Sequence, residues 1–230
     1  MIKMKMRTLI TAPAVVLLAM ALSSSAADKT RFNAKPGKDM KVRLEGTSTV
    51  HDWQVEGPII AGNLTVGEGF PTEPGMAAKP GKLDAAVDIR IPVNSLKSIE
   101  KDGRPYSDRM DEVMQEKLKS PPNRNITFHL TGLELKETAK TKDDPYLCEA
   151  KGELAVAGTT NKITFPVSIL PLAGKRIKVS GKTSISMKDY KVEAPVLVGI
   201  LSTGDKVTLS FEWPVMQAAA PKAVEAAAPK

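Results

Sequence analysis

The residues best suited to chemistry lie in one stretch, Gly46 to Gly57, which reads GTSTVHDWQVEG. His51 beside Asp52 has the composition of an acid–base pair, in which a carboxylate orients an imidazole for proton transfer. The β-branched residues and Trp53 around this pair are typical of a β-strand, however, and neighbours along a strand point to opposite faces. We therefore expect a strand with a bulge near Gly46 to Val50, and with the side chains of His51 and Asp52 apart.

The rest of the sequence offers little for catalysis or metal binding. The chain has two histidines, and neither His51 nor His129 stands at a spacing that gathers zinc ligands. No nucleophile elbow, phosphate-binding glycine loop or dinucleotide-binding motif is present. His129 alternates with Phe128 and Leu130 and is interpreted as a surface imidazole, and the single cysteine, Cys148, as a buried apolar filler. The sequence thus favours a protein that is not an enzyme and that uses no metal or cofactor.

The first residues predict export. Basic residues precede an apolar run from Leu9 to Leu22, and Ser25-Ala26-Ala27 offers the small residues that a signal peptidase requires. The run is shorter than the about 20 apolar residues of a membrane span, and Pro13 interrupts it. We expect a signal peptide over 1–27, cleaved near Ala26 or Ala27, and a periplasmic or secreted mature protein with no integral membrane segment.

The charge pattern argues against nucleic acid as a partner. The formal net charge of +7 includes the basic residues of the signal segment, and elsewhere Lys and Arg are interspersed with Asp and Glu. A surface that binds phosphates gathers its cations on one face or along one stripe. We therefore interpret the charged residues as a solvated exterior.

Hydrophobic periodicity predicts one β-domain over 40–216. It is preceded by a linker or covering segment over 28–39 and followed by a flexible tail rich in Ala, Pro and Lys over 217–230. Within the domain, apolar and polar residues alternate in short runs at hairpin spacing, most clearly from Leu83 to Val93. Roughly eight strands indicate a single antiparallel barrel or a sandwich.

One helix interrupts the strands, and it is expected over Asp108 to Ser120. Ser107 or Asp108 provides the N-terminal cap, and the prolines that follow Ser120 end the helix. Its apolar residues share one helical stripe, and these are Met110, Val113, Met114 and Leu118. A redox or haem-associated role for Met110, Met114 and Cys148 has no further support, and core packing explains these residues better.

If the strands close into a barrel, the inward positions are almost wholly apolar. A barrel of about eight strands either fills itself with side chains or holds one slender ligand. Small residues such as Ala85, Ala150 and Gly181 would leave room for the ligand. The residues predicted to line such a tunnel are Val87, Ile89, Phe128, Leu130, Ile169 and Ile185. His51 and Trp53 are predicted at its mouth, because an imidazole and an amphipathic ring suit the boundary between an apolar tail and a wet head group.

Five segments stand out when the chain is taken in order, and they are GTSTVHDW, RIPVNSLKS, MDEVMQEKLKSPPNRNITFHLTGLEL, GELAVAGTTNKITFPVSI and MKDYKVEAPVLVGILSTGDKVTLSF. Together and in this order they resemble motifs of the YceI-like domain family of bacterial periplasms. The resemblance spans about Met40 to Val215. It implies an all-β protein built as an extended, lipocalin-like antiparallel barrel and, for some members, an isoprenoid chain held inside it.

Two functions are expected as alternatives. The first is an exported, non-enzymatic carrier that sequesters a long apolar molecule, isoprenoid-like or another lipid, inside the barrel. The second is a structural or interaction module whose barrel is filled and holds no ligand. A continuous apolar cavity favours the carrier, and a core packed at native density favours the module. The sequence leaves open whether the protein forms a homodimer.

Overall fold

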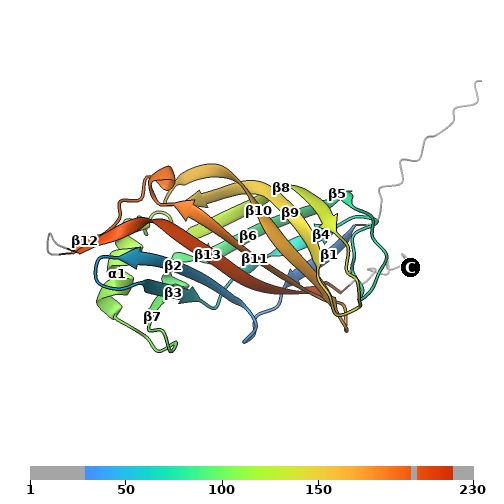
Figure 1. The fold of residues 1–230 in the computed structure, drawn as a ribbon, viewed down its shortest axis with the longest axis horizontal. Helices are drawn as coiled ribbons and strands as arrows, with labels where there is room; N and C mark the ends of the chain where they lie inside the picture. The colour runs from blue at the N-terminus through green and yellow to red at the C-terminus, as the bar shows by residue number, and fades with distance from the viewer. Residues whose placement is uncertain (1–28, 198–200, 220–230) are drawn as a thin grey trace, which may run out of the picture.

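The computed structural model describes residues 29–197 and 201–219, and it shows an elongated β-structure with one α-helix near one end (Figure 1). The predicted signal peptide over 1–27 lies outside the described residues, as does most of the predicted tail. Within the described part of the chain, no helix is long and apolar enough to cross a membrane.

The elements follow the alternation of the sequence. The first strands are β1 (Thr30–Ala34), β2 (Lys41–Ser48), β3 (Trp53–Gly57), β4 (Ala61–Val66), β5 (Gly81–Leu83), β6 (Ala85–Pro92) and β7 (Lys97–Ile99). The later strands are β8 (Asn125–Glu137), β9 (Tyr146–Val156), β10 (Thr159–Leu172), β11 (Arg176–Ser186), β12 (Val196–Leu197) and β13 (Leu201–Gln217). The helical elements are the 3₁₀ turns η1 (Val93–Ser95) and η2 (Lys188–Tyr190) and the α-helix α1 (Asp108–Lys117).

Eight strands close into an antiparallel barrel, in the order β1-β4-β6-β8-β9-β10-β11-β13. The ring is completed where β13 pairs with β1, so that Phe32 lies opposite Gln217 and Ala34 opposite Val215. Closure pairs the edges that an open sheet would expose. The prediction of a single all-β antiparallel barrel of about eight strands with one inserted helix is confirmed.

The long strand β13 pairs with two different strands along one of its edges. Its last residues pair with β1, whereas Thr203 to Glu212 pair with β2. The sheet continues from β2 to β3 and from β3 to β7, and α1 packs beside β7 (Figure 1). One end of the barrel is therefore walled by a hairpin, a short strand and a helix in addition to the closed ring.

The segment 28–39, for which we expected a linker, contributes a strand to the barrel instead. β1 pairs with β4 on one side and with β13 on the other, and Phe32 is only 1% exposed. The alternation of Phe32 with polar neighbours is too short to stand out in the sequence. The predicted tail also begins later than expected, because Gln217 belongs to β13 and the Ala218 amide donates to the Arg31 carbonyl at 2.8 Å.

At the expected strand with a bulge near Gly46 to Val50 the chain forms a hairpin, and the pairing of β2 with β13 is irregular there, because Ser48 lies opposite Thr203 but Gly46 lies opposite Val207. β2 pairs with β3, and Gly46 lies opposite Trp53. The Ser48 hydroxyl closes the turn, since it donates to the His51 carbonyl at 2.7 Å and accepts from the His51 amide at 3.3 Å. The change of parity in the apolar residues therefore marks a reversal of the chain.

The helix begins where the sequence predicts. Ser107 is the N-cap, and its hydroxyl accepts a hydrogen bond from the Met110 amide at 3.4 Å. The helix ends at Lys117, earlier than the predicted end at Ser120, because Lys119 takes a left-handed backbone conformation with φ of 55°. That conformation terminates the helix before the two prolines.

Candidate ligand-binding cavity

A cavity of about 650 Å³ lies at the α1 end of the barrel, and we call it the wide chamber. Its walls come from the β2–β3 hairpin, α1, β11, β13 and the chain around η2. Apolar side chains from distant strands meet in it, including Leu44, Val55, Ile126, Val156, Val207 and Leu209. The volume lies within the roughly 300–1,000 Å³ of typical small-molecule sites.

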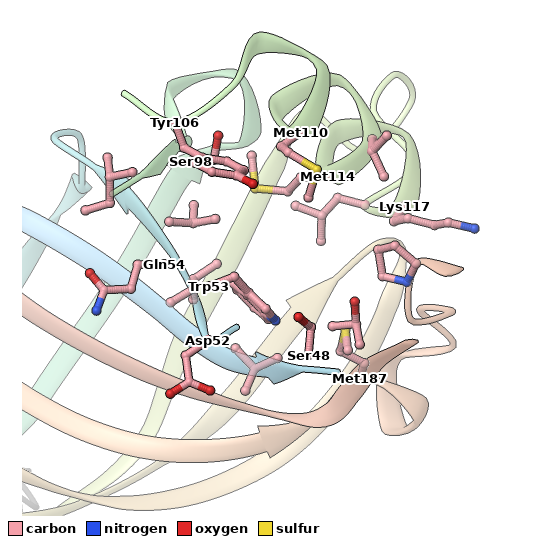
Figure 2. A pocket seen from close by; sticks show the side chains of 18 of the residues that line it. Ser48, Asp52, Trp53, Gln54, Ser98, Tyr106, Met110, Met114, Lys117 and Met187 are labelled. Carbon is pink, nitrogen blue, oxygen red and sulfur yellow. The ribbon is translucent and has the colours of Figure 1, made fainter. Parts of the chain in front are cut away.

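The helix α1 supplies one side of the wide chamber. The predicted stripe of Met110, Val113, Met114 and Leu118 lines it in full. Figure 2 shows Met110 and Met114 projecting from the helix on the side that faces Trp53, whereas Lys117 extends away. The apolar face of α1 is thus turned toward the chamber, and the methionines offer it a flexible lining.

A buried carboxylate fixes α1 to β7. Asp111 is 5% exposed, and its Oδ1 accepts from the Ser98 amide at 2.6 Å and from the Ser98 hydroxyl at 2.8 Å. Its Oδ2 lies 3.0 Å from Lys97 Nζ. Burial alone would raise the pKa of Asp111, but the hydrogen bonds from Ser98 and the charge of Lys97 together hold it below its usual value. The helix is therefore anchored by an ionised side chain.

Trp53 forms the opposite wall because its partner across the hairpin is a glycine. A Cβ at Gly46 would lie 2.2 Å from Cζ2 of Trp53, so the indole ring occupies the space that a side chain would fill. The indole Nε1 donates to the Thr47 carbonyl at 3.2 Å. The ring is held at its polar edge and presents apolar surface to the chamber (Figure 2).

His51 stands in the hairpin turn and also lines the wide chamber. Its Nδ1 lies 2.8 Å from the Asp52 carbonyl oxygen, and its Nε2 lies 3.4 Å from the hydroxyl of Tyr106, which precedes α1. The two rings meet edge to face, with centroids 5.8 Å apart. His51 therefore joins the hairpin to the loop before α1. Its contact with Asp52 is to the backbone and not to the carboxylate, as we expected for side chains that point apart.

A second cavity, the narrow cavity, measures about 90 Å³ and lies along the middle of the barrel. The predicted lining residues Val87, Ile89, Phe128, Leu130 and Ile169 all border it. Ile185, His51 and Trp53 border the wide chamber instead. Leu209 borders both cavities. The eight residues singled out from the sequence are thus divided between two cavities.

Three phenylalanines fill the middle of the barrel. Phe165 packs edge to face against Phe128 at 5.5 Å and against Phe211 at 6.3 Å between ring centroids. Phe211 lies over Gly181, where an added Cβ would come within 2.8 Å of the ring. The room that Gly181 was expected to leave for a ligand is therefore taken by Phe211.

Beyond Ile185, His51 and Trp53, the residues that enclose the larger space were not singled out from the sequence. Met187, Tyr190 and Val192 line the wide chamber from the segment around η2, and the stripe of α1 lines it from the other side. Tyr190 and Val192 have no strand alternation that could reveal an inward position, whereas Met187 continues the period of two from Ile185. The apolar stripe of α1 was a further available signal, and it was interpreted as core packing.

The remaining chemical candidates lie away from both cavities. His129 is exposed, as predicted, and its Nδ1 lies 2.7 Å from Asp88 Oδ1 on the neighbouring strand. Cys148 is 3% exposed, which confirms the buried filler, and burial raises the pKa of its thiol to about 12. Among residues 29–197 and 201–219, no group of three His, Cys, Asp or Glu side chains comes together as a metal site would need.

The similarity to known proteins extends over most of the barrel. The model of the YceI-like domain family matches residues 39–214. A polyisoprenoid binding domain from Saccharophagus degradans, implicated in plant cell wall breakdown, is similar with a TM-score of 0.56 at 12% identity, covering 84% of this chain and 99% of that chain. BcnA of Burkholderia cenocepacia is similar with a TM-score of 0.53 at 15% identity, covering 76% of this chain and 95% of that chain. A search of curated proteins gave no match. At these identities the structural likeness shows a shared fold.

Proposed function

The chain belongs to the YceI-like domain family, and we propose on that premise that it is a non-enzymatic binding protein for an apolar, isoprenoid-like or other lipid molecule. The observation that carries the proposal is the wide chamber of about 650 Å³. An interior packed at native density would contain few voids larger than a water molecule. A chamber of this size with an apolar lining supports a ligand-binding barrel over a filled module.

The ligand would occupy the wide chamber first. The narrow cavity of about 90 Å³ has room for only a short end of an apolar chain, because its volume is about a seventh of the 650 Å³ of the wide chamber. Leu209 borders both spaces, so a chain end could pass beside it. The Saccharophagus degradans protein is described as a polyisoprenoid binding domain, and this description supports an isoprenoid-like ligand as the first candidate.

Export is part of the same proposal. The basic and apolar leader over 1–27 predicts a periplasmic or secreted mature chain that begins after Ala26 or Ala27. Intact mass measurement of the protein purified from its own cell envelope tests this. An uncleaved N-terminus in a cytoplasmic fraction would contradict export, but it would not affect the proposal that the protein binds an apolar ligand.

The binding proposal is tested by native mass spectrometry of the protein from its own cells, followed by lipid extraction. A matched pair of variants then locates the ligand with a fluorescent isoprenoid as probe. Ile185→Trp inserts bulk into the wide chamber, whereas Ile89→Trp inserts it beside the narrow cavity. Overpacking a filled region costs about 1–3 kcal/mol. We expect Ile89→Trp to lose this much stability and to keep the probe, and Ile185→Trp to keep stability and lose the probe.

The opposite outcome identifies the filled module. If the wild-type protein carries no lipid, binds no probe, and loses as much stability from Ile185→Trp as from Ile89→Trp, the chamber is closed by packing in solution. The barrel would then act through its outer surface.

A further inference from the structure

Tyr190 is the last residue of η2, and its side chain carries a hydroxyl group into the buried interior. The residue is 2% exposed and lines the wide chamber. Its hydroxyl is buried and has no hydrogen-bond partner within residues 29–197 and 201–219. The other two tyrosines differ, because the Tyr146 hydroxyl donates to the Met76 carbonyl and the Tyr106 hydroxyl contacts His51. A buried hydroxyl without a partner destabilises a protein, so such a group in a ligand cavity suggests a partner that arrives with the ligand.

The backbone around Tyr190 is held in place, so the position of the ring is defined. The Tyr190 amide donates to the Met187 carbonyl at 3.0 Å. The Lys188 amide donates to Asp205 Oδ1 at 3.0 Å, and the Asn161 side-chain amide donates to the Asp189 carbonyl at 2.7 Å. η2 is thereby tied to β10 and β13. Because the segment that carries Tyr190 is already fixed, a ligand that contacts the residue has less backbone to order when it binds.

The hydroxyl keeps its proton in the physiological range. Burial, and to a smaller degree the neighbouring Asp189 carboxylate, raises the pKa of Tyr190. A neutral phenol donates one hydrogen bond and can also accept. The group is therefore suited to an oxygen acceptor and carries no charge that would attract a cationic or anionic head group.

We propose that the Tyr190 hydroxyl is a ligand-binding group that donates a hydrogen bond to an uncharged oxygen, such as a carbonyl, ether or hydroxyl, on an otherwise apolar ligand. This inference rests on the proposed function, because it requires a ligand in the wide chamber. An anionic head group is disfavoured there, since burying a charge without a partner is costly. The described residues of the lining include three cations, and none of them is free inside the chamber: Lys117 is 3.7 Å from Glu193, Arg104 is 2.7 Å from Asp102, and Lys101 is exposed to solvent in the loop before α1.

The ligand must move a side chain to reach this hydroxyl, which has almost no accessible surface in the empty chamber. Met187 precedes Tyr190 by one turn and lines the same chamber. Its unbranched side chain adapts to different shapes without movement of the backbone. Binding would therefore be accompanied by a local rearrangement at η2, with the barrel unchanged.

The test compares three ligands of equal chain length in wild-type protein and in Tyr190→Phe, which removes only the hydroxyl. Farnesene has no oxygen, farnesyl methyl ether has an uncharged acceptor, and farnesoic acid has an anionic head. Each displaces a fluorescent isoprenoid, and Tyr146→Phe is the control, because Tyr146 borders neither cavity and its hydroxyl donates to the Met76 carbonyl. We expect the preference of wild type for the ether over farnesene to fall about three- to tenfold in Tyr190→Phe, as the loss of one hydrogen bond predicts, and to persist in Tyr146→Phe.

A second measurement uses the ligand-free protein. Removing an unpaired buried hydroxyl should leave the melting temperature unchanged or raise it by a few degrees. A clear fall, or failure of Tyr190→Phe to fold, would mean that the hydroxyl is paired inside the protein and would overturn the inference. Equal preference for the ether in Tyr190→Phe and wild type would overturn it too, as would tighter binding of farnesoic acid than of the ether. Either of these two binding results would leave the proposed function, binding of an apolar ligand, intact. The proposed function fails if the wild type binds none of the three ligands and does not bind the probe.

Discussion

The narrow cavity and the wide chamber lie in the same barrel, but they differ in what faces each wall. Along the middle of the barrel, strand faces strand, and three phenylalanines meet between the walls. At the α1 end, strands face a helix, a hairpin turn and the segment around η2. The interior is filled where side chains of opposite strands interdigitate, and a larger space persists where elements without strand geometry cover the opening. The number of strands alone therefore does not decide whether the barrel is full.

Both regions use glycine to admit an aromatic ring, yet the result differs. Phe128 packs over Gly152 and Phe211 over Gly181, so the rings complete the packing in the middle. Trp53 packs over Gly46 in the same way, but its other face borders open space. An aromatic ring that packs over a glycine thus fills the interior only where side chains of another strand lie against its other face.

The largest expected effect comes from adding one methyl group in the filled region. A Cβ at Gly152 would lie 2.4 Å from Phe128 Cζ and 2.5 Å from the His129 carbonyl oxygen. Because the backbone oxygen cannot move aside, we expect Gly152→Ala to lower the free energy of unfolding by about 3 kcal/mol, measured by urea denaturation. Gly132→Ala on the paired strand is the matched control, since its Cβ would meet only Lys151 Cβ at 4.0 Å. Equal stability of the two variants would show that the middle of the barrel is not tightly filled.

The next effect concerns the anchor of α1, which keeps the wide chamber covered. Asp111→Ala leaves the buried Ser98 amide without its acceptor, so we expect a loss of about 2 kcal/mol. Glu112→Ala on the exposed face of the same helix should change stability little, because its ion pair with Arg109 is in water. Hydrogen exchange of the α1 amides would show whether Asp111→Ala frees the helix while the strands stay protected.

The same carboxylate should make the helix sensitive to acid. The folded-state pKa of Asp111 is below its ordinary value of 3.8, so its contribution is complete above that value and is lost as the pH falls through the lowered pKa. In Asp111→Asn this part of the acid dependence should disappear. Urea denaturation of both proteins across the acidic range measures the difference, and identical pH profiles would contradict the ionised anchor.

A methyl group added in the open region should affect binding more than stability. Gly46→Ala forces the Trp53 ring away from the hairpin, and the wide chamber offers it space. We expect a stability loss of about 1 kcal/mol but roughly tenfold weaker binding of a fluorescent isoprenoid, which corresponds to about 1.4 kcal/mol. Gly37→Ala, which would contact nothing within 4 Å, is the control. A stability loss as large as that of Gly152→Ala would remove the contrast between the two regions.

The smallest effect is expected at Cys148, on the wall of the filled region. Burial raises the pKa of its thiol to about 12, so almost no reactive thiolate forms at neutral pH. The folded protein should therefore resist alkylation by iodoacetamide over hours and react promptly in urea, as followed by intact mass. Fast labelling of the folded protein would show that the wall opens to solvent.

The sequence alone predicted most of the walls of this barrel, with β1 as the exception. Alternation placed Val87, Ile89, Phe128 and Leu130 inside the barrel, because a period of two assigns each residue of a strand to one face. Capping by Ser107 and the apolar stripe of α1 located the helix for an equally local reason. The ordered motifs identified the family, and its fold followed.

What those walls enclose depends on how distant segments pack together. Alternation does not reveal which side chain lies across the barrel, so the ring of Phe211 over Gly181 and the division of the interior into two cavities had no signal in the sequence. The reversal between Gly46 and Trp53, the closure by β1 and the unpaired hydroxyl of Tyr190 depend on contacts between distant segments. A cavity is the space that such contacts leave, and it is therefore defined only when the chain has closed around it.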